Sequence, residues 1–383
     1  MHFARSDRFS AFLLLGAAAL ALIIANSPLG DAVTGLNDAH LEIAPLGIDL
    51  SIAHWISDGL LAIFFLLVAI ELKHELTRGE LATPARAIAP AIAALGGVIV
   101  PALIFVAITA GSGYMEGWPI PTATDIAFAL GVLAVFGRGL PGRIRAFLLA
   151  LAVLDDLVAI LIIAVFFTRE PQFGLVLASL ASVAAFGLLS RLLHTKFRVV
   201  VMIALVITGV LAWYFMLQSG VHATIAGVAL GLAMKRDPAG HLRHSLEPFS
   251  NAIILPLFAF SAALVPLPQV PPSDLAAPFW GIVIGLPIGK LIGITAAGAL
   301  ISVLHRRRAQ GGLDLGELVT VAALGGIGFT VSLLMNELAF EESPLIVDEG
   351  TLAVLIGSAI SIVLSALMVS LLASRHRRTE NVV

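Results

Sequence analysis

Residues 153–160 read VLDDLVAI and place two adjacent carboxylates, Asp155 and Asp156, inside an apolar run long enough to cross a bilayer. Each charge near the middle of a membrane helix costs about 2.5 to 3.5 kcal/mol on an insertion scale. Pairing or a functional role must offset that cost. The stretch therefore predicts a membrane-spanning fold and a site within it.

The composition of the whole chain is that of an integral membrane protein. Of its 383 residues, 59% are hydrophobic and 12% are charged, and the mean hydropathy is +1.03. These values lie outside the range of soluble globular domains. Cysteine is absent, which excludes disulfides and thiolate metal sites.

Apolar runs of about 17 to 25 residues are long enough to span the hydrocarbon core, and they predict an all-α polytopic protein with twelve transmembrane helices. The helices are centred near residues 18, 65, 98, 129, 155, 183, 208, 227, 257, 291, 327 and 362. Residues 9–28 form the first helix. A signal peptide over residues 9–25 is the alternative, and the many apolar segments that follow favour a helix.

The Lys and Arg residues indicate how these helices are oriented. Alternate loops collect all 22 of them except Arg169, in an opposite loop, and Lys290, within a span. Short cytoplasmic loops carry the excess of positive charge in membrane proteins. Both termini are therefore predicted to be cytoplasmic.

Residues 40–51, in the first outside loop, have a pattern of their own. Apolar and acidic residues alternate in LEI (41–43) and IDL (48–50), on either side of the turn signal PLG (45–47). The pattern predicts a β-hairpin, and a plain solvated loop is the alternative. The open edge of a hairpin is able to pair with a second subunit.

Two spans, 119–136 and 316–338, are interrupted by residues that break helices. The first begins PIPTATDIAF and the second contains AALGGIGFTV. The breaking residues are Pro119, Pro121, Gly325, Gly326 and Gly328. A simple kink in each helix is the alternative, because Gly and Pro are tolerated in membrane helices.

The two interrupted spans also match each other. IAFALGVL (126–133) and IGFTVSLL (327–334) share Ile, Phe and Leu at a constant offset of 201 residues. The offset covers an odd number of predicted crossings, so the units 87–167 and 278–373 are predicted to be inverted repeats within one domain, residues 1–383. Transporters built in this way bind their substrates at mid-membrane, beside the interrupted helices.

Four charged residues cannot be assigned to a loop: Asp125, Asp155, Asp156 and Lys290. Together they cost about 10 to 14 kcal/mol before any pairing, more than a fold would carry for packing alone. An inert ion pair between Lys290 and one aspartate is the alternative, and it leaves two carboxylates unpaired.

Adjacent helix positions differ by about 100°, so Asp155 and Asp156 are expected to face different partners. One should meet Lys290, which lies in GLPIGKLIG (285–293), where glycines permit close helix approach. The other should join Thr124 and Asp125.

Those groups would form an oxygen-rich site of the kind that Na⁺ or Li⁺ requires. If the interrupted helices cross at their breaks, helix ends carrying about half a unit charge of each sign come together. Asp125 would then offset the positive ends and Lys290 the negative ones.

Such a site can hold two kinds of occupant. Burial and mutual repulsion disfavour ionised carboxylates, so protons compete with the metal cation for them. Exposing the site to the two sides of the membrane in turn would exchange one ion for the other. Two titrating carboxylates per monovalent cation would move net charge, so the exchange should also respond to voltage.

Six motifs in order along the chain support this interpretation. They are TATDIAFALGVLA (122–134), LDDL (154–157), SGVHATIAG (219–227), LPLFAF (255–260), GKLIGI (289–294) and GGIGFTVS (325–332). Between about residue 10 and residue 372 the chain resembles the NhaA-type bacterial sodium/proton antiporters. The resemblance implies a fold whose fourth and eleventh helices are unwound and crossed at mid-membrane. It also implies an inner-membrane homodimer joined partly through the hairpin.

The same resemblance implies roles for individual residues. Asp156 and Asp155 would be the cation and proton carboxylates, with Lys290 as the partner of Asp155. Thr124 and Asp125 would belong to the crossed assembly beside them. The partners would be Na⁺ or Li⁺, H⁺ and the lipid bilayer, with no cofactor, no enzyme activity and no nucleic acid.

The resemblance further implies inactivity at acidic pH and activation as the pH rises, through ionisable groups near the cytoplasmic entrance. The candidate pH-sensing residues are Asp58, Glu71, His74, Glu75, His222 and Glu247. Histidine titrates near neutrality. Ordinary polar helix ends are the alternative.

The sequence departs from the family pattern in three places. His74 stands where an Arg is usual. In LRHSLEPF (242–249), Arg243 replaces an acidic residue and Glu247 replaces a His. Ser-Ala-Ala at 261–263 replaces the Asn-Ala-Gly that normally follows LPLFAF. None of these is a membrane carboxylate, so antiport should be retained with a shifted pH profile.

Other functional classes fit less well. An intramembrane aspartyl protease needs a GxGD signature, which neither LDDL nor TATD supplies. A cation channel needs a repeated filter, and none is visible. A sodium-coupled solute symporter of similar fold is the alternative that the sequence leaves open.

Overall fold

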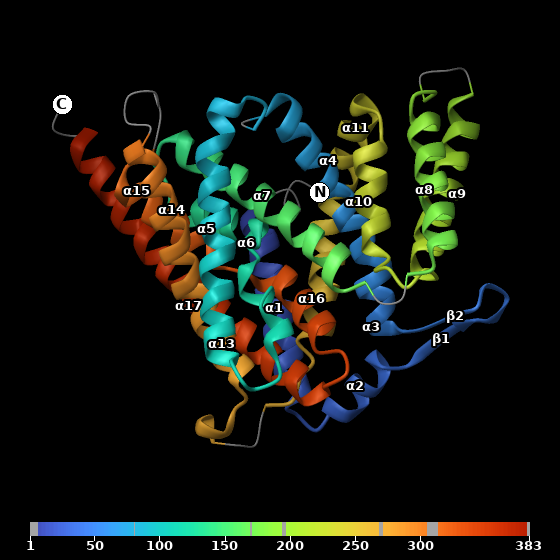
Figure 1. Cartoon of the computed structure of the whole chain (residues 1–383), viewed down its shortest axis with the longest axis horizontal. Helices are drawn as coiled ribbons and strands as arrows, with labels where there is room; N and C mark the ends of the chain where they lie inside the picture. The colour runs from blue at the N-terminus through green and yellow to red at the C-terminus, as the bar shows by residue number, and fades with distance from the viewer. Residues whose placement is uncertain are drawn as a thin grey trace.

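The chain is folded as a bundle of α-helices with one small hairpin at its edge (Figure 1). The computed structural model describes residues 7–79, 81–168, 171–193, 197–267, 271–304 and 313–380. Among the loop cations counted above, Arg5, Arg169, Lys196, Arg306, Arg307 and Arg308 lie outside the described residues.

The elements of the first half run from the first helix to the span that carries the paired aspartates. They are α1 (Asp7–Ala25), α2 (Gly30–Asn37), β1 (His40–Ile43), β2 (Ile48–Ser51), α3 (Ile52–His54), α4 (Leu61–Arg78), α5 (Pro84–Thr109), α6 (Ile126–Phe136) and α7 (Gly142–Phe166). Short 3₁₀ turns lie at Ala44–Leu46, Met115–Gly117 and Ile120–Thr122, and a π-helical segment at Trp55–Leu60 leads into α4.

The described part of the second half contains helices and no strand. Its helices are α8 (Phe173–Ser190), α9 (Arg198–Leu217), α10 (Thr224–Ala233), α11 (Arg236–Phe249), α12 (Leu255–Ala262), α13 (Ala277–Ile284), α14 (Lys290–Leu304), α15 (Leu315–Gly325), α16 (Phe329–Ala339) and α17 (Pro344–Glu380). A 3₁₀ turn lies at Pro272–Asp274, and π-helical segments lie at Ser250–Ile254 and Gly285–Gly289.

The predicted polytopic membrane fold is confirmed. Within the described ranges, nine helices are long and apolar enough to cross a membrane, or up to eleven if each of two bent helix pairs counts as one span. With the shorter apolar helix α10, these segments correspond in order to the twelve predicted spans. One bent pair is α15 and α16, which meet at 47° around the predicted glycine break.

The hairpin at residues 40–51 is also confirmed. β1 and β2 are antiparallel, with His40 opposite Ser51 and Ile43 opposite Ile48. Gly47 closes the turn with φ of 61°, a left-handed conformation that favours glycine. The hydroxyl of Tyr214, on α9, donates to the carbonyl of Leu46 at 2.8 Å, so this helix supports the turn.

Close packing of α5 against α14 depends on small residues, as the glycines around Lys290 predicted. A Cβ on Gly293 would clash with the carbonyl group of Gly96. A Cβ on Gly289 would lie 2.8 Å from the Cα of Pro101, which is also too close. Without side chains at these positions the two backbones approach closely, as they do in many membrane helix pairs.

The two interrupted spans meet at their breaks. The N–H of Asp125 donates to the carbonyl of Ile327 at 2.6 Å, and the hydroxyl of Ser332 donates to the carbonyl of Ile120 at 2.7 Å. Just beyond the breaks, the rings of Phe128 and Phe329 pack edge to face with centroids 4.8 Å apart. The breaks therefore form one crossed unit, which lies between α7 and α14 and positions the site.

The first half of the fourth span differs from an ordinary helix. Only a 3₁₀ turn over Ile120–Thr122 forms there, and Ala123 to Asp125 are not helical. Pro119 and Pro121 lack the N–H groups that an α-helix would use. A similar effect explains the π-helical segment Gly285–Gly289, which contains Pro287 and ends directly before Lys290.

Candidate functional site

An ion pair between Asp155 and Lys290 lies in the interior of the bundle. Asp155 is on α7, Lys290 is the first residue of α14, and both side chains are fully buried. Nζ of Lys290 lies 2.6 Å from Oδ2 of Asp155 and also donates to Oγ1 of Thr124 at 3.0 Å. The structure therefore contains the expected contact between Lys290 and one of the two aspartates.

Thr124 connects this pair to the crossed breaks. Its hydroxyl lies 2.6 Å from Oδ2 of Asp155 and 2.7 Å from the carbonyl oxygen of Gly325, and either oxygen can accept its proton. The sequence had suggested that Thr124 joins the aspartate that does not pair with Lys290. The structure corrects this grouping, because Thr124 lies between the ammonium group and the end of α15.

Two carboxylates at the site have oxygens without a hydrogen-bond donor. Oδ1 of Asp155 is buried and unpartnered. Asp156 is also buried, with 6% of its surface exposed, and no described group donates to it. The charges of Asp155, Asp125 and Lys290 all act on Asp156, and so does the charge of Glu71 on α4.

Asp125 has the opposite character, because its carboxylate is fully engaged. Oδ1 accepts the N–H groups of Ala127 and Phe128, at 3.1 and 3.2 Å, in the first turn of α6. Oδ2 accepts both the hydroxyl and the N–H of Thr330, at 2.6 and 3.2 Å, in the first turn of α16. One negative charge therefore lies at the positive ends of two half-helices.

Sequence reasoning missed Thr330. The one available signal was a hydroxyl residue directly after the glycine break, in GGIGFTV, where side chains often bond to helix ends. The three glycines named from the sequence lie at this break, since α15 ends at Gly325 and α16 begins at Phe329.

The candidate pH-sensing residues fall into two groups that lie far apart along the second span. Glu71, on α4, forms an ion pair with Arg243 on α11, and Arg243 lies 3.9 Å from Glu247. His74 is exposed and Glu75 is buried on the same part of α4. In this group, Arg243, which departs from the family pattern, joins α11 to α4.

Asp58 and His222 form the other group, with Oδ1 and Nδ1 4.0 Å apart. Asp58 lies in the π-helical segment Trp55–Leu60, near the hairpin and at the opposite end of the span from Glu71. The two groups cannot share one entrance, because the 13 positions between Asp58 and Glu71 correspond to about 20 Å of helix.

An apolar groove of about 1300 Å³ runs between α4, α9, α10 and the hairpin. Trp55, Leu66, Met202 and Trp213 are among the residues that line it, and none of the four buried charges does. The groove is therefore separate from the buried charges at the crossed breaks.

Interrupted helices that cross beside buried carboxylates and a buried lysine define a secondary ion transporter. The family model described as Na⁺/H⁺ antiporter 1 matches residues 1–369. The chain is 56% identical over 378 residues to the Na⁺/H⁺ antiporter NhaA 2 of Clavibacter michiganensis, covering 98% of this chain and 92% of that protein.

The Na⁺/H⁺ antiporter NhaA of Tropheryma whipplei is 44% identical over 371 residues, with 96% and 94% of the two chains covered. NhaA 2 of Pseudomonas syringae is 44% identical over 384 residues, with 98% and 95% covered. The chain belongs to the NhaA family of bacterial sodium/proton antiporters, which are multi-pass membrane proteins.

Proposed function

We propose that this antiporter exchanges cytoplasmic Na⁺ or Li⁺ for external H⁺ at one site formed by Asp155 and Asp156, exposed alternately to the two sides of the membrane. The observation that carries the proposal is that Oδ1 of Asp155 and the carboxylate of Asp156, at consecutive positions of α7, accept no hydrogen bond from a described group. At the crossed breaks, these are the buried carboxylate oxygens that have no described hydrogen-bond donor, whereas both oxygens of Asp125 have donors.

The charges around the crossing explain why the two ions compete. Three buried carboxylates face one buried ammonium group, so full ionisation leaves excess negative charge in a medium that solvates it poorly. A metal cation or protons can neutralise that excess. Once one of them is bound, the negative charge that attracts the other is gone. Two protons per Na⁺ would make the cycle electrogenic.

A transported ion must also leave its site. Among the described residues, no cluster of three or more His, Asp or Glu side chains is arranged to hold a metal ion. Two carboxylates form a weaker site than a complete ligand cage, which suits a cargo ion that protons displace.

Contacts between equivalent positions support the proposed inverted repeats, 87–167 and 278–373. Residues related by a two-fold axis contact each other when they lie close to that axis. Thr124 and Gly325, which are 201 positions apart, share a hydrogen bond, and Phe128 and Phe329 have the same offset and pack together. NhaA is itself one of the transporters in which inverted-topology repeats are found.

We place the protein in the bacterial inner membrane with both termini in the cytoplasm. The support is the concentration of Lys and Arg in alternate loops. On this assignment the hairpin is periplasmic, and the ends of α4 and α11 that carry Glu71 and Arg243 are cytoplasmic.

Dimerisation through the hairpin is a further part of the proposal. β1 and β2 pair with each other, and in the described chain each has one unpaired edge. Hydrogen bonds from Tyr214 and Gln218 of α9 hold the turn, so the edges are presented in a defined position. A second copy could extend the sheet there.

We assign pH regulation to the cytoplasmic ends of α4 and α11. The ion pair between Arg243 and Glu71 joins these helices, and Glu247 lies beside it. Neutralising Glu71 would weaken the connection, because Glu71 is the partner of Arg243 on the other helix. His74 and Glu75 lie on the same part of α4, whereas Asp58 and His222 would act on the other side of the membrane.

Purified protein in sealed vesicles with an imposed pH gradient tests the proposal. Addition of Na⁺ or Li⁺, without any organic solute, should dissipate the gradient, and a membrane potential should change the rate. Asp156→Asn should abolish the signal. Asp274→Asn, in an exposed loop, is the matched control and should retain it.

A sodium-coupled symporter would require an organic solute in this assay. A channel or leak would dissipate the gradient equally in Asp156→Asn. Either result would contradict the proposed exchange.

A further inference from the structure

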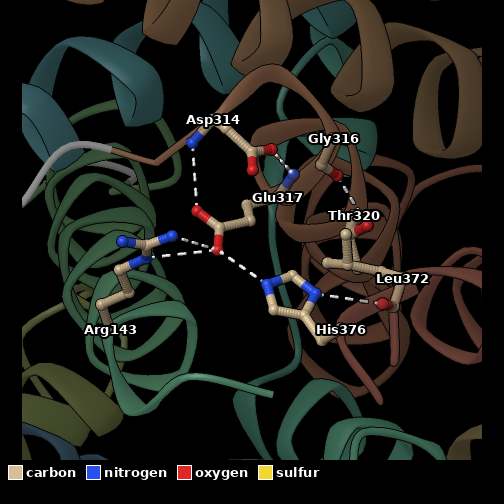
Figure 2. Close-up of polar contacts among 7 residues, drawn as sticks. All are labelled: Arg143, Asp314, Gly316, Glu317, Thr320, Leu372 and His376. Atoms are coloured by element: carbon tan, nitrogen blue, oxygen red, sulfur yellow. Dashed lines mark hydrogen bonds and ion pairs between the residues drawn. The ribbon is translucent and has the colours of Figure 1, made fainter. Parts of the chain in front are cut away.

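Another buried carboxylate, Glu317, lies away from the crossing, in the first turn of α15. Its side chain is completely buried, and Oε1 accepts from Nη2 and Nε of Arg143 at 2.6 and 3.2 Å. Nε2 of His376, on α17, lies 3.7 Å from the same oxygen. Figure 2 shows the carboxylate between these two basic side chains.

The two carboxylate oxygens of Glu317 have different partners. Oε2 accepts the N–H of Asp314 at 3.0 Å, while the side chain of Asp314 accepts the N–H of Glu317, which forms a reciprocal cap at the start of α15. Oε1 contributes nothing to that cap. It contacts two other helices instead.

The position of Arg143 is unfavourable with respect to its own helix. It is the second residue of α7, where a positive charge opposes the helix dipole. Glu317 offsets that effect and lies in the first turn of its own helix, where a negative charge is favourable. The pair therefore joins the starts of α7 and α15.

The same two helices reach the ion site further along. α7 carries Asp155, and α15 ends at Gly325, whose carbonyl oxygen lies 2.7 Å from Oγ1 of Thr124. About 12 Å of helix separates Glu317 from Gly325. A shift of α15 at its start would move that carbonyl relative to Thr124 and Asp155.

We propose that Glu317 is a positioning residue for the ion site. By binding Arg143 it sets α15 against α7, and so places the Gly325 carbonyl beside the hydroxyl that contacts Asp155. Glu317 itself does not touch the transported ion. The inference rests on the proposed function of the Asp155 and Asp156 site.

Glu317→Gln tests the proposal directly. The variant keeps the shape and an oxygen for the helix cap, and it leaves Arg143, whose side chain is 46% exposed, in contact with water. In the vesicle assay, the Na⁺ concentration that gives half-maximal exchange should rise about tenfold, as for partners that orient an ion ligand. The maximal rate should stay close to that of wild type.

Thr320→Val is the matched control. Its hydroxyl lies in the same helix and donates to the carbonyl of Gly316 within that helix, so it joins no other element (Figure 2). Its half-maximal Na⁺ concentration should equal that of wild type.

If Glu317→Gln does not fold, Arg143→Lys and Arg143→Gln provide the comparison. Retention of Na⁺ affinity with Lys and its loss with Gln would support the proposal. Equal half-maximal concentrations in both would overturn it. So would a folded Glu317→Gln whose half-maximal Na⁺ concentration is unchanged, with or without a lower maximal rate.

Failure of this inference is distinguishable from failure of the proposed function. If wild-type protein moves no protons in response to Na⁺, the proposed function is wrong. If wild-type protein exchanges the ions and Glu317→Gln matches its affinity, only the positioning role is wrong.

Discussion

Nζ of Lys290 lies 2.6 Å from Oδ2 of Asp155, and neither side chain is exposed. Removing one member of such a pair leaves the other buried without compensation, which typically reduces the free energy of unfolding by about 3 to 5 kcal/mol. We therefore predict that Asp155→Asn and Lys290→Gln, each made singly, strongly lower the thermal unfolding temperature of the purified protein. The double variant Asp155→Asn/Lys290→Gln should recover much of that loss. Additive losses in the two single variants and the double variant would contradict a direct pair.

Thr330 is predicted to be important for the crossing. Thr330→Val keeps the side-chain shape but removes the hydroxyl that donates to Oδ2 of Asp125 at 2.6 Å. Loss of a donor to a buried charged group should reduce the free energy of unfolding by about 1 to 3 kcal/mol. Thermal unfolding measures this, with Thr320→Val as the control. Equal stability of the two variants would show that the hydroxyl does not support Asp125.

Packing of α10 against α4 gives a steric prediction. A Cβ on Gly227 would collide with the carbonyl oxygen of Ala62, whereas a Cβ on Gly16 meets no atom within 4 Å. Gly227→Ala should therefore lower the unfolding temperature, because backbone cannot move as easily as a side-chain tip. Gly16→Ala, inside α1, should not lower it, because Ala favours a helix more than Gly does. Comparable unfolding temperatures for both variants would mean that the helices are less closely packed than described.

The pH profile of exchange should depend on Arg243 more than on His74. Arg243 contacts the carboxylates of Glu71 and Glu247, whereas His74 is exposed. Removing the guanidinium in Arg243→Ala takes the positive charge away from Glu71, which favours the protonated carboxylic acid of that residue. If ionised Glu71 activates transport, half-maximal activity should move to higher pH. Exchange rates in vesicles between pH 6 and pH 9 measure this, and a larger shift in His74→Ala would contradict the assignment.

Hydropathy and charge predicted most of the fold, because both act locally. The apolar runs gave the spans, the glycines and prolines marked the breaks, and the cost of isolated charges identified Asp155, Asp156 and Lys290. The hairpin followed from its alternation and turn. Each of these signals is present within a short stretch of chain.

Partners between distant segments were harder to predict. Thr124 was grouped with the other aspartate, and neither Thr330 nor Glu317 was identified. Their roles depend on which half-helices meet, and 205 residues separate Asp125 from Thr330. Hydropathy does not report such contacts, since a hydroxyl in an apolar helix more often bonds to its own backbone.

In the proposed mechanism, Na⁺ and H⁺ compete for the carboxylates of Asp155 and Asp156. Titration calorimetry of the purified protein with Na⁺, in buffers that differ in ionisation enthalpy, counts the protons released for each ion bound. We predict proton release on Na⁺ binding in the wild type and loss of Na⁺ binding in Asp156→Asn. Binding of Na⁺ without any proton release would contradict the account.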